Sequence, residues 1–105
     1  MSPAEIDWKV GQVRFWDLGA IDDRLPLADQ ALKLKEDLAQ IEYPSGVILD
    51  VGWYPEFSVD GNFIVLVAPP GEWERPLFNK IARTMVDLKE RLTEGVQIAV
   101  RAIQE

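Results

Sequence analysis

Three carboxylates lie close together in the middle of the chain: Asp50, Glu56 and Asp60. Two carboxylates can act as general acid and general base, and the apolar neighbours of Asp50 would raise its pKa. Structural roles explain the same residues, because Asp60 precedes Gly61 in a turn, Glu56 suits an exposed position, and Asp50 can face solvent or bond a nearby backbone group. The chain has no His and no Cys and carries no nucleophile motif. We therefore expect a protein that is not an enzyme.

Metal and nucleotide sites find no support in the residue spacing. The segment Asp60-Gly61-Asn62 lacks the alternating ligands of a calcium loop. The glycines are scattered and build no phosphate-binding loop of the G-x-G-x-x-G or G-x-x-x-x-G-K type. We expect neither a metal ion nor a cofactor.

Aromatic and acidic residues alternate around the same region and favour recognition of a partner. Tyr54 and Trp73 are of the types enriched at interface hot spots. Ordinary core packing is the alternative, and alternation along its strand places Trp53 inside. Helix capping also accounts for the two neighbouring Asp residues near the N-terminus. The predicted partner-binding residues are Tyr54, Glu56, Asp60, Glu72, Trp73, Glu74, Asp22 and Asp23.

The negative charge is unevenly distributed along the chain. The net charge is −7, and residues 1–60 hold 12 Asp or Glu against 5 Lys or Arg, whereas residues 61–105 hold 6 of each. A direct nucleic-acid ligand is disfavoured, since phosphate binding requires a basic face. A basic protein partner would be attracted by this charge. The alternative is that the acids only keep a small domain soluble.

Length and composition indicate one domain, residues 1–105, that buries a little under ~70% of the surface of the unfolded chain. Absence of Cys suits a reducing compartment. No apolar run approaches the ~20 residues that span a bilayer. The N-terminus is acidic and lacks the layout of a signal peptide. We expect a cytoplasmic protein that does not bind membranes.

The hydrophobic pattern predicts elements in the first two thirds of the chain. A strand is predicted around residues 12–17, and then a helix that ends at 43–46 and carries an apolar stripe of Leu27, Ala31, Leu34, Leu38 and Ile41. Strands are predicted at 46–54 and 62–68, joined by an Asp60-Gly61 hairpin turn. Because Pro55 cannot complete a ladder hydrogen bond, a bulge or break is expected at residues 54–56.

The last third predicts a loop at 69–76, a helix at 76–93 and a strand at 96–103. The predicted fold is an α+β two-layer sandwich with two helices on a mainly antiparallel sheet of three or four strands, in the order (β)-α-β-β-α-β. The strand at 62–68 is apolar on both faces, which predicts that both are covered. The N-terminal segment or a second copy of the chain would cover the face away from the helices.

Three segments resemble a bacterial protein family. They are residues 49–55 (Leu-Asp-Val-Gly-Trp-Tyr-Pro), residues 60–67 (Asp-Gly-Asn-Phe-Ile-Val-Leu-Val) and residues 73–77 (Trp-Glu-Arg-Pro-Leu). Over about residues 46–92 the sequence resembles the immunity proteins of polymorphic toxins and of contact-dependent growth inhibition systems. A D-x-G-[WY] strand, a hairpin with a D/N-G turn, and a following W-x-x-P-L helix start are familiar in such families.

The resemblance implies a cytoplasmic protein that binds the C-terminal domain of a cognate toxin and blocks its active site. Many such toxins are nucleases with basic clefts, which an acidic inhibitor complements. The resemblance transfers no catalytic residue. The alternative is a small homodimeric ligand-binding domain, or an enzyme, that uses Asp50 and its aromatic neighbours.

Overall fold

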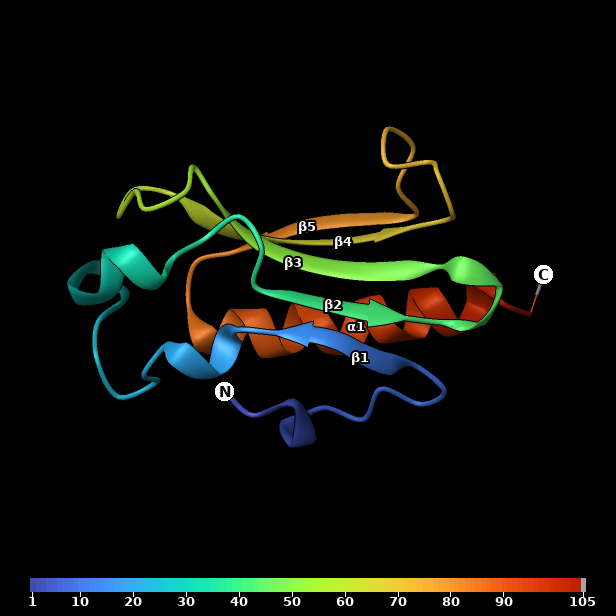
Figure 1. Ribbon diagram of the computed structural model, residues 1–105, viewed down its shortest axis with the longest axis horizontal. Coiled ribbons are helices and arrows are strands. Elements are labelled where there is room, and N and C mark those ends of the chain that lie inside the picture. The colour runs from blue at the N-terminus through green and yellow to red at the C-terminus, as the bar shows by residue number, and fades with distance from the viewer. Residues whose placement is uncertain (105) are drawn as a thin grey trace.

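The chain folds into one antiparallel sheet with one long α-helix packed on it (Figure 1). The computed structural model describes residues 1–104. The strands lie in chain order across the sheet: β1 (Gln12–Trp16), β2 (Ala39–Glu42), β3 (Ile48–Tyr54), β4 (Asn62–Ala68) and β5 (Phe78–Ala82). Helix α1 (Met85–Ala102) follows, and short 3-10 segments are η1 (Pro3–Glu5), η2 (Leu18–Ala20), η3 (Leu27–Lys33) and η4 (Pro44–Gly46). The predicted α+β class with an antiparallel sheet is confirmed, but the described sheet has five strands.

Alternation along the strands decides which side of the sheet is buried. Leu49, Val65 and Val67 are fully buried. A Cβ added at Gly95 of α1 would lie 3.2–3.5 Å from these three side chains, so they face the helix. Residues on the other side of the sheet, such as Asp50, Ile64 and Leu66, are half-buried, whereas Gly52 and Ala68 are buried. The predicted alternation in β3, which places Trp53 inside, is confirmed. The predicted cover over both faces of β4 is not, because Ile64 and Leu66 on its outer side are only half-buried.

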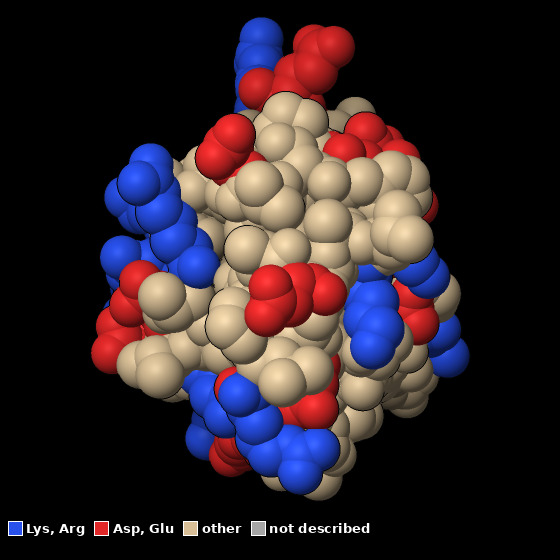
Figure 2. Space-filling view, turned by 90° about the vertical axis from the view of Figure 1, so that its left-hand side faces the viewer, with Lys and Arg blue, Asp and Glu red and all other residues tan. Residues whose placement is uncertain are grey.

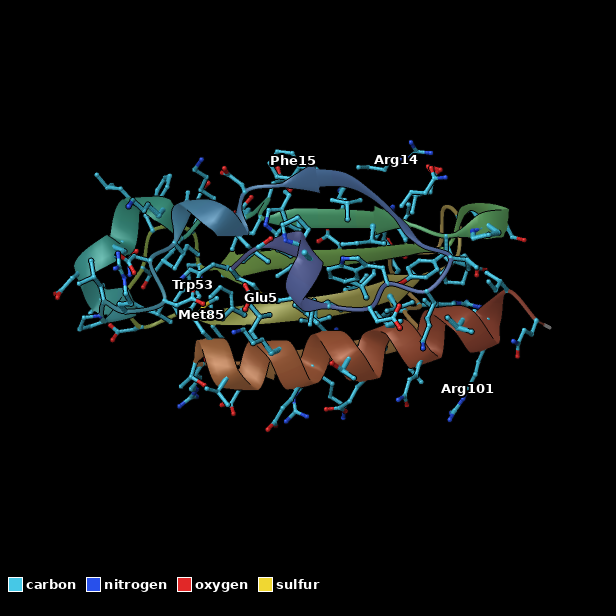
Figure 3. The ribbon with its side chains drawn as sticks, turned by 90° about the horizontal axis from the view of Figure 1, so that it is seen from below. Glu5, Arg14, Phe15, Trp53, Met85 and Arg101 are labelled. Atoms are coloured by element: carbon cyan, nitrogen blue, oxygen red, sulfur yellow. The ribbon has the colours of Figure 1, made fainter. Side chains whose placement is uncertain are left out.

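The N-terminal segment lies on the same side of the sheet as α1. Trp8 packs edge-on against Trp16, with ring centroids 5.7 Å apart. Glu5 forms an ion pair of 2.9 Å with Lys89 of α1, and Figure 3 shows Glu5 between the sheet and the helix. The expectation that this segment covers the opposite face is wrong, because its Trp side chains complete the core beside α1.

The predicted helix over the stripe from Leu27 to Ile41 is wrong. Only η3 is helical there, and it is a 3-10 segment interrupted at Gln30, whose φ is −127°. Residues 39–42 instead form β2, which pairs with both β1 and β3. Ala39 and Ile41 are fully buried at a spacing of two. The apolar residues are spaced by three or four, which suits a helix. Residues 39–42 nevertheless form a strand, because they pair with both neighbouring strands.

The helix predicted at 76–93 is confirmed only over residues 85–93, and the strand predicted at 96–103 is wrong. Residues 78–82 form β5 at the sheet edge, with Phe78 and Ala82 buried. The helix begins only after Thr84, whose hydroxyl oxygen accepts a hydrogen bond from the Asp87 N–H (3.0 Å). It then continues through Gly95 and the predicted strand at 96–103. Gly95 does not end the helix, because its missing side chain lets α1 approach β3 and β4 closely.

The hairpin between β3 and β4 has a longer loop than predicted. Tyr54 pairs with Asn62, so residues 55–61 form the connection instead of Asp60 and Gly61 alone. Strand β3 ends at Tyr54, as the predicted break at residues 54–56 requires. The Tyr54–Pro55 peptide bond is cis, and Phe57 has a positive φ of 63°. None of the helices within residues 1–104 combines the length and apolar character needed to cross a membrane.

Candidate functional site

One side of the sheet is left uncovered by α1 and the N-terminal segment. The strand register aligns one residue from each strand across it, in the order Phe15, Gln40, Asp50, Leu66 and Asn79. A neighbouring row holds Gly52, Ile64 and Ile81. Gly52 is buried beneath the Glu36 backbone and the Tyr54 ring, so this row is open only at Ile64 and Ile81. We call this surface, made of the two rows, the open face. Phe15 is 42% exposed and Ile81 51% exposed, and Figure 3 shows Phe15 pointing away from α1.

Asp50 lies at the centre of the open face, on the middle strand. The Gln40 side-chain amide donates a hydrogen bond of 3.1 Å to its Oδ1, and none of the cationic groups of residues 1–104 forms an ion pair with it. Burial raises the pKa of Asp50, and the charge of Asp37 raises it further, whereas the Gln40 hydrogen bond lowers it. The fold thus places the Asp50 carboxyl group where burial disfavours its charged form.

We predict that Asp50→Asn raises the melting temperature at neutral pH. The pKa of Asp50 is higher in the folded protein than in the unfolded chain. The charged carboxylate therefore lowers the free energy of unfolding at every pH above the pKa of the folded state. This destabilisation disappears as the pH falls below the ordinary Asp value of about 4. The gain should therefore shrink on acidification, as measured by thermal unfolding across pH. Asp60→Asn, in the exposed hairpin loop, controls for the change in net charge. A lower melting temperature for Asp50→Asn at neutral pH would contradict this account.

Tyr54 marks a corner of the open face where negative charge gathers. Its hydroxyl donates a hydrogen bond of 3.3 Å to the Glu36 carbonyl oxygen. Burial raises the pKa of Tyr54, and the charges of four carboxylates raise it further. One of them is Asp50 itself, and we call the other three the acidic corner: Glu36, Asp37 and Glu56. Within residues 1–104 none of them takes part in an ion pair.

Six other acids of the first 60 residues are neutralised locally. Each of the following carboxylates contacts a cationic group within 4.0 Å: Glu5, Asp7, Asp17, Asp22, Asp23 and Glu42. The Arg24 guanidinium lowers the pKa of Asp22 to about 2 through its hydrogen bonds. The sequence-level asymmetry of charge therefore does not become one continuous acidic surface. The acidic corner keeps its charge uncompensated.

The predicted partner-binding residues separate into two groups at opposite ends of the sheet. Tyr54, Glu56 and Asp60 lie at the β3–β4 hairpin, whereas Trp73 and its two Glu neighbours lie in the β4–β5 connection (Figure 1). Strand β4 runs between them and spans about 20 Å at 3.4 Å per residue. Trp73 is 48% exposed, but it is not beside the other aromatic residues as expected. Figure 2 shows the hairpin end, where acidic and basic side chains lie among uncharged surface.

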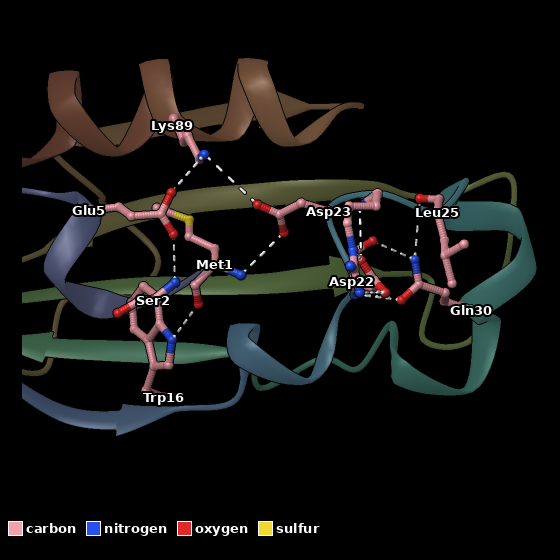
Figure 4. Close-up of polar contacts among 10 residues, drawn as sticks. Met1, Ser2, Glu5, Trp16, Asp22, Asp23, Leu25, Gln30 and Lys89 are labelled. Carbon is pink, nitrogen blue, oxygen red and sulfur yellow. Dashed lines mark hydrogen bonds and ion pairs between the residues drawn. The ribbon is translucent and has the colours of Figure 1, made fainter.

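Asp22 and Asp23 belong to a loop that is held by a buried amide (Figure 4). Gln30 is 6% exposed. Its Oε1 accepts a hydrogen bond of 2.7 Å from the Asp22 N–H, and its Nε2 donates to the Asp22 carbonyl oxygen at 2.9 Å. Asp23 contacts the Met1 amino group at 3.1 Å and Lys89 at 3.8 Å. Both acids therefore serve the local structure of the loop.

We predict that Gln30→Leu destabilises the protein by about 1–3 kcal/mol, because the Asp22 backbone groups lose their buried partners. The free energy of unfolding in denaturant measures this loss. Leu32→Ala is the matched control in the same segment, since Leu32 is 78% exposed and should change stability by less than about 0.5 kcal/mol. Equal effects of the two substitutions would show that the amide network is unimportant.

Sequence reasoning missed several residues of the open face. Phe15, Gln40 and Ile81 come from three strands that are far apart in the chain, and two of those strands were predicted as helix. The one available signal was the apolar outer side of the strand at 62–68, which was interpreted as a covered face. Ile64 and Leu66 on that side are half-buried, without a covering layer in residues 1–104.

No protein-family model matches the chain, and neither the curated proteins nor the solved structures include one significantly similar to it. Within residues 1–104, no group of three or more His, Cys, Asp or Glu side chains is placed to hold a metal ion.

Proposed function

We propose that this chain is a non-catalytic binding protein that neutralises a basic protein partner through the open face. The observation that carries the proposal is an uncovered sheet face that exposes Phe15 and Ile81 and is bordered by the acidic corner. Such a surface combines apolar contact area with uncompensated negative charge. Interfaces of this kind place aromatic and aliphatic anchors inside a polar margin.

From the resemblance to immunity proteins we propose that the partner is a toxin domain with a basic cleft, such as a nuclease. The two proteins would bind each other in the cytoplasm. The acidic corner would accelerate association with such a domain, because opposite potentials steer encounter. The broad side of the molecule, which carries the open face, measures 42 by 28 Å. This is enough for the ~800 Å² that each partner buries in a standard interface.

The experiment is co-purification of this protein with the product of the adjacent upstream gene, at low and at high salt. We expect a complex that is tighter at low salt, because screening weakens exposed charge pairs, and we expect co-expression to relieve toxicity of that product. A neighbour that is not toxic and does not bind would contradict the proposal.

Substitution then separates the open face from the rest of the surface. Ile81→Ala is expected to weaken the complex by about tenfold, the effect of an apolar anchor worth 1–2 kcal/mol, as measured by calorimetry. Val86→Ala is the control, because Val86 is 68% exposed on α1 and lies outside the open face. Loss of affinity in the control but not in Ile81→Ala would place the interface elsewhere.

A further inference from the structure

Asp50 has a position that stability alone does not explain. It lies in the middle of the five-residue row, between Gln40 on one side and Leu66 on the other. Its neighbours along the outer side of β3 are Ile48 and Gly52, so the surroundings are mainly apolar. A hydrophobic residue at this position would suit the row better than a carboxylate.

We propose that Asp50 is the anchor for one Lys or Arg side chain of the protein partner, inserted at the centre of the open face. This inference rests on the proposed function and identifies the residue at the centre of the interface. Hot spots concentrate near the middle of an interface, where surrounding apolar contacts exclude water. The row provides that surrounding, with Phe15 and Leu66 on either side of the Gln40–Asp50 pair.

The arrangement of hydrogen bonds favours a cation over a neutral donor. Gln40 donates to Oδ1, which fixes the carboxylate, and within residues 1–104 no hydrogen bond is directed at Oδ2. Four carboxylates act together on the nearby Tyr54 hydroxyl: Asp50, Asp37, Glu36 and Glu56. Two cations lie beside the open face, but both are already engaged: Arg14 pairs with Glu42 at 3.4 Å, and Arg83 donates to the Asn62 side chain at 2.8 Å. An incoming guanidinium or ammonium group would therefore meet, at Asp50 itself, a carboxylate without an ion-pair partner in residues 1–104.

A second copy of this chain fits the same surface less well. Two open faces stacked on each other would bring two Asp50 carboxylates and two acidic corners together, between molecules that each carry a net charge of −7. Like charges brought together at an interface cost several kcal/mol. Nucleic acid is disfavoured for the same reason.

The first test requires no partner. n-Butylguanidinium is titrated into the ¹³C-labelled protein, with neutral n-butylurea as the matched probe, and the Asp50 carboxyl and Leu66 methyl signals are followed by NMR. We expect saturable shifts with n-butylguanidinium and much smaller ones with n-butylurea. Asp50→Asn should abolish the saturable response, and Glu90→Gln, which removes the same charge from the exposed side of α1, should leave it intact. Equal shifts with both probes, shifts without saturation, or an unchanged response in Asp50→Asn would overturn the inference.

The second test uses the product of the adjacent upstream gene. If a complex forms, Asp50→Asn should weaken it at least tenfold, because it leaves a buried cation without its partner, while Glu90→Gln should not. A complex of unchanged affinity in Asp50→Asn would overturn this inference and leave the proposed function standing. Failure of the unmodified protein to bind would contradict the proposed function, and self-association of the free protein through the open face would overturn both.

Discussion

Gly52→Ala is expected to destabilise the protein by about 3 kcal/mol, the upper end of the usual cost of overpacking. A Cβ at this position would lie 1.9 Å from the Glu36 carbonyl oxygen and 2.8 Å from the Tyr54 ring. The Glu36 group is backbone, so it cannot rotate away as a flexible side chain would. The melting temperature should fall by at least about 10 °C for a domain of this size.

The matched control for this substitution is Gly19→Ala. A Cβ at Gly19 would have its nearest neighbour at 3.7 Å, an ordinary contact, and the residue lies in η2. We expect it to change stability by less than about 0.5 kcal/mol. If both variants unfold at the same denaturant concentration, the close passage of residue 36 over β3 is not a feature of the protein in solution.

Trp53→Ala is expected to cost about 3–5 kcal/mol, as large-to-small substitutions of buried aromatic residues do. Trp53 is 2% exposed and packs edge-on against Phe63, with ring centroids 4.9 Å apart. Its indole N–H donates a hydrogen bond of 2.7 Å to the Ser58 carbonyl oxygen. Because this bond ties the 55–61 loop to the core, the loop should also become more susceptible to proteolysis.

Trp73→Ala provides the comparison, since it removes the same side chain from an exposed loop. Trp73 is 48% exposed and lies at the other end of the sheet. Its loss should change the free energy of unfolding by less than about 0.5 kcal/mol. Denaturant unfolding followed by circular dichroism measures both variants, and a Trp73 effect as large as that of Trp53 would refute this assignment of core and surface.

The centre of the sheet could be predicted from the sequence. In β3, apolar residues at every second position, such as Leu49 and Val51, agree with the turn signals on either side, while β4 is a continuous apolar run. The period of two is unambiguous over seven residues and places Trp53 in the core. The break after Tyr54 followed from the missing N–H of Pro55.

Strand β1 agrees with the strand predicted around residues 12–17, but β2 and β5 could not be predicted, for a physical reason. Strand β2 has four residues and β5 has five, too few to establish a period against an adjoining apolar stripe with helical spacing. Their strand structure depends on hydrogen bonds to β1, β3 and β4. Gly95 resembled a stop signal, and only the contact of α1 with Leu49 and Val65 explains why the helix continues through it.

The candidate site was predicted in part. The region around Tyr54 and Glu56 does carry uncompensated charge, whereas Trp73 is separated from it by the length of β4. Tyr54 and Trp73 are close in the sequence but lie at opposite ends of β4. Phe15 and Asn79 are far apart in the sequence, but the register of four strand pairs places them in one row. A sequence alone does not provide that register when two of the strands are not identified.

The central claim is that the open face binds a basic protein partner. The most direct measurement is an NMR chemical-shift map of this protein in complex with the product of the adjacent upstream gene. The account predicts the largest changes at Phe15, Asp50 and Leu66, with little change at Glu90 on the far side of α1. A map in which α1 or the 69–77 connection changes most, while the open face stays as in the free protein, would contradict it.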